Sequence, residues 1–244
     1  MMVWTKNWQE ALMKKAKVLV IAAAALGIFT GCSKFEPDGT AVLAGKNGKV
    51  TAVVMEALDQ SYYDSTELQN LINTSVAEYN ASAGTEKIKV KKFQASDQKA
   101  ELTMEYAGGA DYAAFNDVAF FTGDILSAYD AGYSFDTTFQ KIEKGNVVNA
   151  SVNRSEVLNS YNYYTVILEE PMEVQVEGSL VYVSSNVEVT GKNTCRVLAS
   201  GSTASTSAEE TENSTMEDGT VVLSPTSVTG TRSSESELAY IMYE

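Results

Sequence analysis

Short stretches in which apolar and polar residues alternate recur along this chain, and alternation is the pattern of a strand with one buried face. The first two stretches, residues 40–44 and 49–56, are separated by Gly45-Lys46-Asn47-Gly48. An Asn-Gly pair between two such stretches is typical of the tight turn of a β-hairpin. We therefore predict an antiparallel pair of strands at the beginning of the fold.

A second hairpin is predicted over residues 88–93 and 100–106. Every second residue of the later stretch is apolar, so only one face of this sheet is expected to be covered. Lys91-Lys92 breaks the alternation of the earlier stretch and predicts a β-bulge. Further strands are predicted at residues 163–168, 172–176, 180–183, 187–190, 195–198 and 238–243.

Helical spacing replaces alternation between Asp64 and Gly84. Asp64-Ser65-Thr66-Glu67 is typical of a helix N-terminus, and a glycine such as Gly84 readily ends a helix. Shorter helices are predicted to open at residues 108–111 and 122–124, with a helical turn at 154–158. The apolar residues of the long helix are Leu68, Leu71, Ile72, Val76 and Tyr79.

These elements predict an α+β fold, with antiparallel sheets, two to four short helices and mostly β structure in the C-terminal half. Residues 200–220 interrupt the pattern, because Ser, Thr, Glu and Gly dominate and Met216 is the only large apolar residue. Such a composition cannot bury enough surface to offset the cost of ordering, which predicts a disordered acidic insertion. Strand character resumes after the insertion, so we expect a single domain over residues 40–244.

The N-terminal region has a pattern of its own. A basic cluster, Met13-Lys14-Lys15-Ala16-Lys17, precedes an apolar run over residues 18–29 and then Thr30-Gly31-Cys32. A charged start, a short apolar core and small residues at the end are typical of a secretory signal peptide. The alternative, a membrane-spanning helix, would need about 20 apolar residues, and this run has only 12.

The end of this segment resembles the lipobox of bacterial lipoproteins. Thr30 and Gly31 are small enough for a signal peptidase pocket, whereas Phe29 stands where these lipoproteins usually carry Leu. The resemblance implies cleavage before Cys32 and a diacylglyceryl group on the Cys32 thiol. Phe29, Thr30 and Gly31 would then be the residues that the signal peptidase recognises.

This interpretation divides the N-terminal region into three parts. Residues 13–31 are the expected signal peptide, and residues 32–39 are the lipidated cysteine and a short spacer. Residues 1–12 fit neither part, because they lie upstream of the basic cluster where a signal peptide normally begins. We interpret them as a spurious extension, with Met13 as the alternative start.

Four short motifs follow in the first half of the mature chain. They are Tyr62-Tyr63-Asp64, Glu78-Tyr79-Asn80, Asp111-Tyr112-Ala113-Ala114-Phe115-Asn116 and Ala128-Tyr129-Asp130-Ala131-Gly132-Tyr133. Together they resemble a group of uncharacterised lipoproteins of gut Firmicutes. The resemblance implies an envelope lipoprotein of a Gram-positive anaerobe and supplies no catalytic residue.

Charge and residue content narrow the possible functions. Removing residues 1–31 takes away four of the 18 basic residues and one of the 32 acidic ones, which changes the net charge from −14 to −17. Nucleic acid is therefore not an expected partner, because binding it needs a basic patch. The chain has no histidine, which excludes His-dependent hydrolases and zinc sites with His ligands. With Cys32 lipidated, Cys195 is expected to be a buried free thiol, and neither a metal nor a cofactor is expected.

Five aspartates are interleaved with aromatic residues between positions 108 and 139. Aromatic rings can stack on sugars, and two carboxylates can serve as acid and base in glycoside hydrolysis. The nearest candidates for such a site are Asp117, Asp124 and Asp130. The interpretation that we favour is structural, because Asp111 and Asp124 stand where helix caps belong and aromatic rings at helical spacing suit a core-facing side.

We therefore expect a lipid-anchored protein on the extracytoplasmic face of the cell membrane. Its domain is expected to be a non-enzymatic binding or structural module of the cell envelope. The expected partners are the membrane, reached through the N-terminal lipid, and a cell-wall or envelope protein component. The alternative is a carboxylate-dependent, glycan-directed envelope hydrolase.

Overall fold

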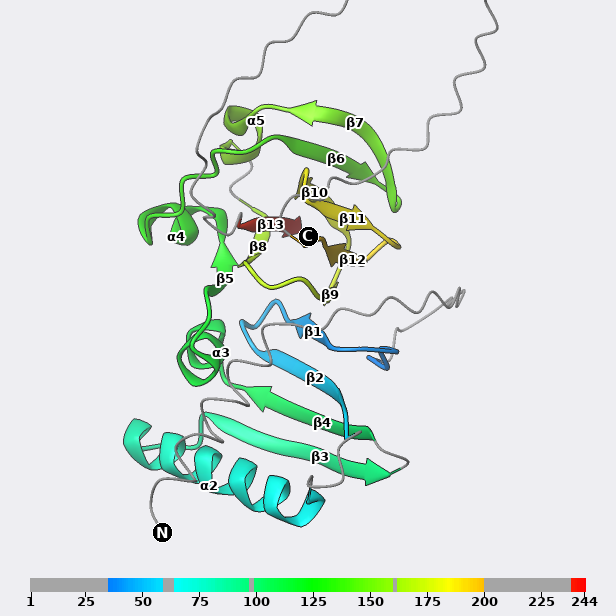
Figure 1. Cartoon of the computed structure of the whole chain (residues 1–244). Helices are drawn as coiled ribbons and strands as arrows, with labels where there is room; N and C mark the ends of the chain where they lie inside the picture. Colours follow the sequence, from blue (N-terminus) through cyan, green and yellow to red (C-terminus); the bar gives the residue numbers. More distant parts are fainter. Residues whose placement is uncertain (1–34, 59–63, 97–98, 160–161, 200–237) are drawn as a thin grey trace, which may run out of the picture.

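The computed structural model describes residues 35–58, 64–96, 99–159, 162–199 and 238–244. These residues form 13 strands in two sheets together with four helices, as Figure 1 shows. The predicted α+β class is confirmed, and strands dominate the C-terminal half as expected. The insertion predicted at residues 200–220 lies outside the described residues.

Sheet A contains seven strands: β1 (Ala41–Ala44), β2 (Val50–Ala57), β3 (Ile88–Ser96), β4 (Lys99–Tyr106), β9 (Glu173–Val176), β11 (Val187–Val189) and β12 (Thr194–Val197). Their order is β11-β12-β9-β1-β2-β4-β3. Both predicted hairpins are present, and the register shift between Val90 and Lys92 confirms the predicted bulge. β1 and β9 pair in parallel, while the other strand pairs of this sheet are antiparallel.

Sheet B contains six strands: β5 (Phe120–Asp124), β6 (Phe139–Glu143), β7 (Asn146–Val152), β8 (Tyr164–Leu168), β10 (Leu180–Ser184) and β13 (Ala239–Tyr243). Their order is β5-β8-β13-β10-β6-β7, and every pair is antiparallel. β8, β10 and β13 were predicted, whereas β5, β6 and β7 were not. β7 escaped prediction because six of its seven residues are exposed, so its sequence carries no apolar alternation.

The four described helices are α2 (Ser65–Ala83), α3 (Gly109–Asn116), α4 (Ile125–Asp130) and α5 (Arg154–Leu158). The carboxylate of Asp64 caps α2 by accepting hydrogen bonds from the backbone N–H groups of Thr66 (2.7 Å) and Glu67 (3.1 Å). Gly84 ends α2 in the left-handed conformation, with φ of 68°. The 19 residues of α2 thus match the long helix predicted between Asp64 and Gly84. None of these described helices combines the length and the apolar character that crossing a membrane requires.

A first core fills the space between the two sheets. Its members come from both sheets and from α2 and α3, so sheet A packs against a layer made by sheet B and these two helices. The apolar surface removed from water here is the dominant stabilising contribution to the fold. The first core comprises Val42, Ala44, Val50, Ala52, Val76, Ile88, Met104, Tyr106, Tyr112, Phe120, Ile142, Val166, Leu168, Met172, Val174, Val176, Leu180, Val183, Val187, Cys195, Val197, Ala239, Ile241 and Tyr243.

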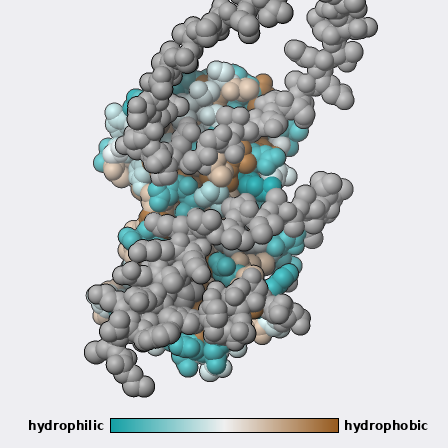
Figure 2. Space-filling view, viewed as in Figure 1, coloured by the Kyte–Doolittle hydropathy of each residue, from teal (hydrophilic) through white to brown (hydrophobic). Residues whose placement is uncertain are grey.

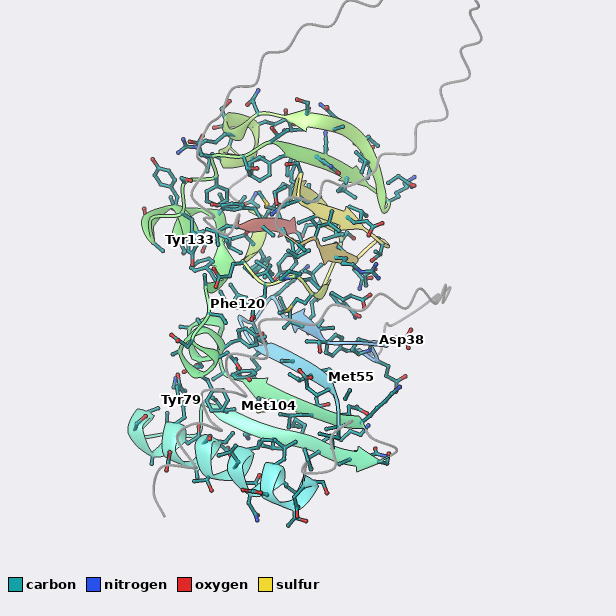
Figure 3. All side chains as sticks on the ribbon, viewed as in Figure 1. Asp38, Met55, Tyr79, Met104, Phe120 and Tyr133 are labelled. Atoms are coloured by element: carbon teal, nitrogen blue, oxygen red, sulfur yellow. The ribbon has the colours of Figure 1, made fainter. Side chains whose placement is uncertain are left out.

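A second core lies on the opposite face of sheet B, where α4 and α5 contribute residues. Aromatic rings dominate it, and the centroid of the Tyr240 ring lies 4.9 Å from that of Phe135 and 6.0 Å from that of Phe139. Among the residues labelled in Figure 3, Met104 and Phe120 belong to the first core, and Tyr133 packs against the second. The second core comprises Ile125, Ala128, Phe135, Phe139, Val152, Val157, Ile167, Tyr182, Tyr240 and Met242.

The strand β13 belongs to both cores. It lies between β8 and β10 in the middle of sheet B, and all five of its residues are buried. Successive side chains of a strand point to opposite faces, so Ile241 enters the first core while Tyr240 and Met242 enter the second. The five residues of β13 therefore contribute side chains to both cores.

Two side-chain hydrogen bonds hold β13 in place. The backbone N–H of Tyr240 donates to the buried hydroxyl of Ser184 at 2.8 Å. The hydroxyl of Tyr243 donates to the carbonyl oxygen of Gly45 at 3.3 Å. Because Gly45 belongs to the turn between β1 and β2, this second bond ties sheet B to sheet A.

Truncating a β13 side chain should destabilise the whole fold. Ile241 is fully buried, so Ile241→Ala is expected to lower the free energy of unfolding by about 2–5 kcal/mol. Urea unfolding followed by circular dichroism measures this change. The matched control is Val148→Ala in β7, where the side chain is 52% exposed and the expected change is under about 0.5 kcal/mol. Equal losses for the two variants would contradict the central role of β13.

Candidate functional site

The three candidate aspartates lie at separate helix ends. Asp117 follows α3 in the left-handed conformation (φ 54°, ψ 51°), Asp124 precedes α4, and Asp130 is the last residue of α4. All three are exposed. Because α4 has six residues, it spans about 9 Å at about 1.5 Å per residue, with Asp124 and Asp130 at opposite ends. The structure thus distributes these carboxylates along the surface.

Asp124 is the N-cap of α4, as the capping interpretation expected. Its carboxylate accepts a hydrogen bond from the backbone N–H of Ser127 at 2.7 Å and another from the Ser127 hydroxyl at 2.9 Å. These bonds, the backbone one above all, hold the pKa of Asp124 below its usual range. A carboxylate that stays ionised complements a helix N-terminus. It does not suit a general acid, which needs a raised pKa.

The prediction that Asp111 caps α3 was wrong. α3 begins at Gly109 with Gly108 as its N-cap, so Asp111 lies inside the first turn. Gly109 allows α3 to approach β5 closely, because a Cβ there would lie 2.8 Å from the backbone nitrogen of Thr122. Asp111 instead accepts a hydrogen bond from the hydroxyl of Tyr79 at 3.1 Å and so links α3 to α2. Burial and this bond raise the pKa of Tyr79.

Most aromatic rings of residues 108–139 serve the two cores. The prediction that the aromatic rings of this stretch face the core is wrong for Tyr129, whose side chain is 49% exposed. The short helix α4 buries only Ile125 and Ala128, and Tyr129 lies outside with the Arg154 guanidinium 5.9 Å from its ring centroid. The fully or nearly buried rings are Tyr112, Phe120, Phe135 and Phe139.

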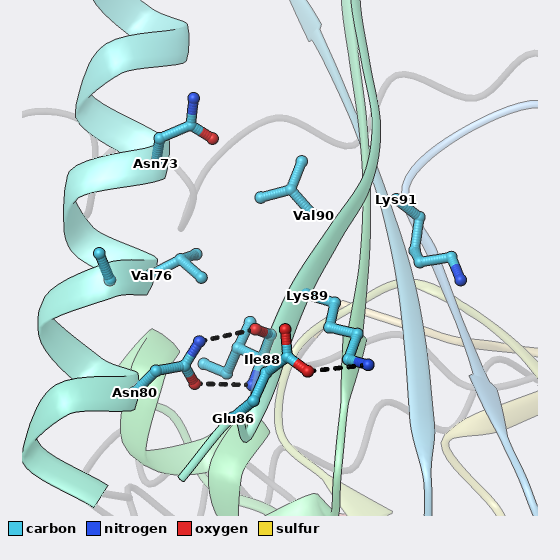
Figure 4. A pocket seen from close by; sticks show the side chains of 9 residues that line it. Asn73, Val76, Asn80, Glu86, Ile88, Lys89, Val90 and Lys91 are labelled. Carbon is cyan, nitrogen blue, oxygen red and sulfur yellow. Dashed lines mark hydrogen bonds and ion pairs between the residues drawn. The ribbon is translucent and has the colours of Figure 1, made fainter. Parts of the chain in front are cut away.

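A hollow of about 540 Å³ lies between α2 and β3 (Figure 4). Its helix side is one face of α2, because positions three and four residues apart are neighbours on a helix. Enclosed, mostly apolar cavities are typical of small-molecule sites, whereas this hollow is open and lined by both polar and apolar side chains. The lining residues are Asn73, Val76, Ala77, Asn80, Glu86, Ile88, Lys89, Val90 and Lys91.

Asn80 makes the most specific contacts in this hollow. Its Oδ1 accepts hydrogen bonds from the backbone N–H groups of Lys87 (2.8 Å) and Ile88 (2.9 Å). Its Nδ2 donates to the carbonyl oxygen of Ile88 at 2.8 Å, and Figure 4 shows the bonds to Ile88 as dashed lines. In a sheet, a neighbouring strand would form hydrogen bonds of the same kind with the backbone N–H and carbonyl groups of Ile88. The Asn80 amide therefore takes the place of a strand at the start of the β3 edge.

This role of Asn80 was not predictable from the sequence. The amide acts on backbone groups rather than on a side chain, and its partners belong to the next element of the chain. Neither the spacing nor the residue type of Ile88 marks it as a partner. An asparagine on the same helix face as the buried Val76 was the only signal available.

The charges beside the hollow are paired. Each partner is at least one third exposed, and exposed ion pairs contribute little to stability. The pairing leaves no strong local excess of either sign for a charged ligand. The pairs are Lys89–Glu86 (2.9 Å), Lys91–Glu105 (3.3 Å) and Lys92–Glu101 (2.7 Å).

Cys195 is the buried thiol that the sequence predicted. It is fully buried in β12, and this burial raises the pKa of its thiol. A thiol that stays protonated is a poor nucleophile and a poor metal ligand. Within the described ranges, no three Asp, Glu or Cys side chains are grouped so that they could hold a metal ion.

The lipobox residues Phe29, Thr30, Gly31 and Cys32 lie outside the described residues. Comparisons of the chain with protein-family models, curated proteins and solved structures give no match.

Removing the Asn80 amide should cost more than removing a neighbouring one. Asn80→Ala leaves backbone groups of Lys87 and Ile88 without these hydrogen bonds, at an expected cost of about 1–3 kcal/mol in the free energy of unfolding. Asn73→Ala is the matched control, because Asn73 is exposed on the same helix face, and should cost under about 0.5 kcal/mol. Urea unfolding measures both. An Asn80→Ala variant as stable as Asn73→Ala would refute the assigned role.

The cap formed by Asp124 predicts a pH dependence. The pKa of Asp124 is lower in the folded chain than its usual value of 3.8, so its contribution to stability is present above pH 3.8 and lost as pH falls through the folded value. Asp124→Asn keeps a capping acceptor but cannot be protonated. Wild type and variant should be equally stable at pH 7, and wild type should lose more stability below about pH 4.

Urea midpoints between pH 7 and pH 2.5 measure this difference. Asp124→Ala serves as the control that removes the cap at every pH, and it should cost about 1 kcal/mol at pH 7. Parallel pH profiles for wild type and Asp124→Asn would show that the carboxylate of Asp124 does not contribute as described.

Proposed function

We propose that this chain is a lipid-anchored lipoprotein of the bacterial cell envelope, whose domain is a non-enzymatic binding or structural module on the extracytoplasmic face of the membrane. The observation that carries the proposal is the segment from Met13 to Cys32. It combines a basic cluster, a short apolar run and Thr30-Gly31 directly before a cysteine. This order of features favours export, cleavage and lipidation at Cys32.

The distance from the anchor to the domain is short. Residues 33–40 separate Cys32 from β1, and an extended chain covers at most about 3.6 Å per residue. The tether therefore reaches no further than about 29 Å by the same measure. An acidic domain held this close to an anionic bilayer is repelled by the surface that anchors it, which favours a domain that faces outward.

The candidate aspartates support the non-enzymatic form of the proposal. A carboxylate-dependent glycan hydrolase, the alternative, needs two carboxyl groups about 5–9.5 Å apart that face the same bond. Asp117, Asp124 and Asp130 are exposed at separate helix ends, and Asp124 is engaged as a cap with a lowered pKa, which does not suit the general acid of such an enzyme. Local structure accounts for the placement of Asp124 without a substrate.

The surface supports a macromolecular partner. The hollow between α2 and β3 is open and carries paired charges, unlike the enclosed apolar pockets of small-molecule sites. The described surface visible in Figure 2 is a mixture of hydrophilic and hydrophobic residues without one broad hydrophobic area. A cell-wall or envelope protein component fits such a surface better than a small molecule.

Lipidation is tested by substituting the proposed anchor. Cells that produce Cys32→Ala and are fed a labelled fatty acid should yield unlabelled protein, either released into the medium or retained unprocessed. The matched control is Cys195→Ala, which removes the other cysteine of the chain and should leave the lipid label and the membrane fraction as in wild type. A Cys32→Ala protein that is labelled, cleaved and anchored like wild type would overturn the proposal.

A further inference from the structure

The strand β1 occupies an inner position of sheet A, although it comes first among the described strands. It pairs with β2 on one side in the antiparallel sense and with β9 on the other side in parallel, over four residue pairs each. Three of its four residues are buried. A pull on the segment that precedes β1 therefore acts on a strand that is hydrogen-bonded on both sides.

Further hydrogen bonds secure the two ends of β1. At its start, the Thr40 hydroxyl accepts a hydrogen bond from the backbone N–H of Met55 in β2 at 3.1 Å. At its end, the carbonyl oxygen of Ala44 accepts one from the backbone N–H of Glu177, the residue after β9, at 3.0 Å. Both ends of β1 are thus tied to a neighbouring strand.

The strand β13 meets β1 at its far end. The backbone N–H of Glu244 donates to the carbonyl oxygen of Ser179 at 3.1 Å, and the N–H of Ser179 donates to that of Glu244 at 3.2 Å. Ser179 lies just beyond the end of β9, and the Tyr243 hydroxyl bonds to Gly45, directly after β1. Thr40 and Glu244 therefore lie at opposite ends of β1, and a line between them runs largely along this strand.

The direction of a pull decides how the hydrogen bonds of a sheet resist it. These bonds run between neighbouring strands, so a pull along a strand loads all bonds of its ladders together. A pull across the strands loads the bonds at one end first and breaks them in turn. Forced unfolding is governed by the unfolding rate, and a barrier that requires many bonds to break together is crossed more slowly.

We propose that residues 40–45, the β1 clamp, form a mechanical clamp that carries tension between the segment preceding β1 and the end of β13. Tension that enters at Thr40 is shared by the ladders with β2 and β9 in shear. It reaches β13 through the contacts of Gly45 with Tyr243 and of Ser179 with Glu244. The edge strand β3 lies outside this path.

The clamp does not rest on the proposed function. A tethered module that holds an envelope partner would experience tension through residues 33–40, which is the load that the β1 clamp resists. The strand order is nevertheless the same whether or not Cys32 carries a lipid. Measurements on the isolated chain therefore test the clamp, while lipid labelling tests the anchor.

Single-molecule force spectroscopy on the full chain tests the clamp by comparing two directions of pulling. Handles on Asp38→Cys and Glu244→Cys, both exposed positions, pull along β1. Cys32→Ser is present in every protein, and Cys195 is fully buried and does not take a handle. The measured quantity is the unfolding force at a fixed loading rate.

Handles on Lys89→Cys and Glu244→Cys supply the matched control. Exposed Lys89 follows Ile88, which is level with Ala44 at the end of β1 through the pairs across β4 and β2. The line from Lys89 to Glu244 therefore crosses the strands and peels β3 from β4.

The unfolding force should be at least about twofold higher along β1 than across the sheet, because the two ladders of β1 break together. This is expected even though β3 pairs with β4 over eight residue pairs and β1 with each neighbour over only four. Equal forces in the two directions, or a lower force along β1, would overturn the proposal.

Two core variants separate the clamp from overall stability. Val42 in β1 and Ile88 in β3 both belong to the first core and are each 1% exposed. Along β1, Val42→Ala should lower the force by at least about 20%, because the cavity loosens the packing of the strand that is pulled. Ile88→Ala removes more apolar surface but should leave this force unchanged, since β3 carries no tension.

Urea unfolding of both variants confirms that each folds and measures its loss of stability. An unchanged force for Val42→Ala would refute the β1 clamp. An equal loss of force for Ile88→Ala would show that the force follows overall stability, and it would refute the clamp as well.

Discussion

Burial of both faces of β13 is the constraint on which the rest of the structure depends. A central strand with apolar side chains on both faces needs cover from two layers, and the two cores provide it. Residues of sheet A cover one face, and the aromatic cluster with α4 and α5 covers the other. The Tyr243 hydroxyl adds a direct link to the turn at Gly45, so the packing and the hydrogen bonds of this strand join the two sheets.

Elements with a local signal were predictable from the sequence. α2 has its cap at Asp64 and its stop at Gly84, and both are present in the structure. The two hairpins of sheet A and the strands from β8 onward were equally predictable from alternation, whereas β5, β6 and β7 were not. The order of the strands was not, because the parallel pair of β1 and β9 joins Ala41 to Glu173. No local pattern encodes a contact between residues so far apart in the chain.

The candidate site shows the same limit. Asp124 was recognisable as a cap because a cap is a local feature, whereas the role of Asp111 depends on Gly109 approaching Thr122 and on Tyr79 from another helix. The contacts of Asn80 depend on β3 lying beside α2. The sequence could therefore indicate candidate residue types, but it could not predict which of them contact one another in the fold.

The position of β13 in the chain has a consequence for how the molecule is made. β8 and β10 are the strands on either side of it, and both precede it by a long stretch that includes residues 198–238. A chain emerging in order from a ribosome or a translocation pore therefore holds two unpaired strand edges and two open cores until residues 239–243 arrive. Sheet B can therefore be completed only after β13 has emerged. Any factor that shields β8 and β10 during that interval protects the nascent chain from aggregation.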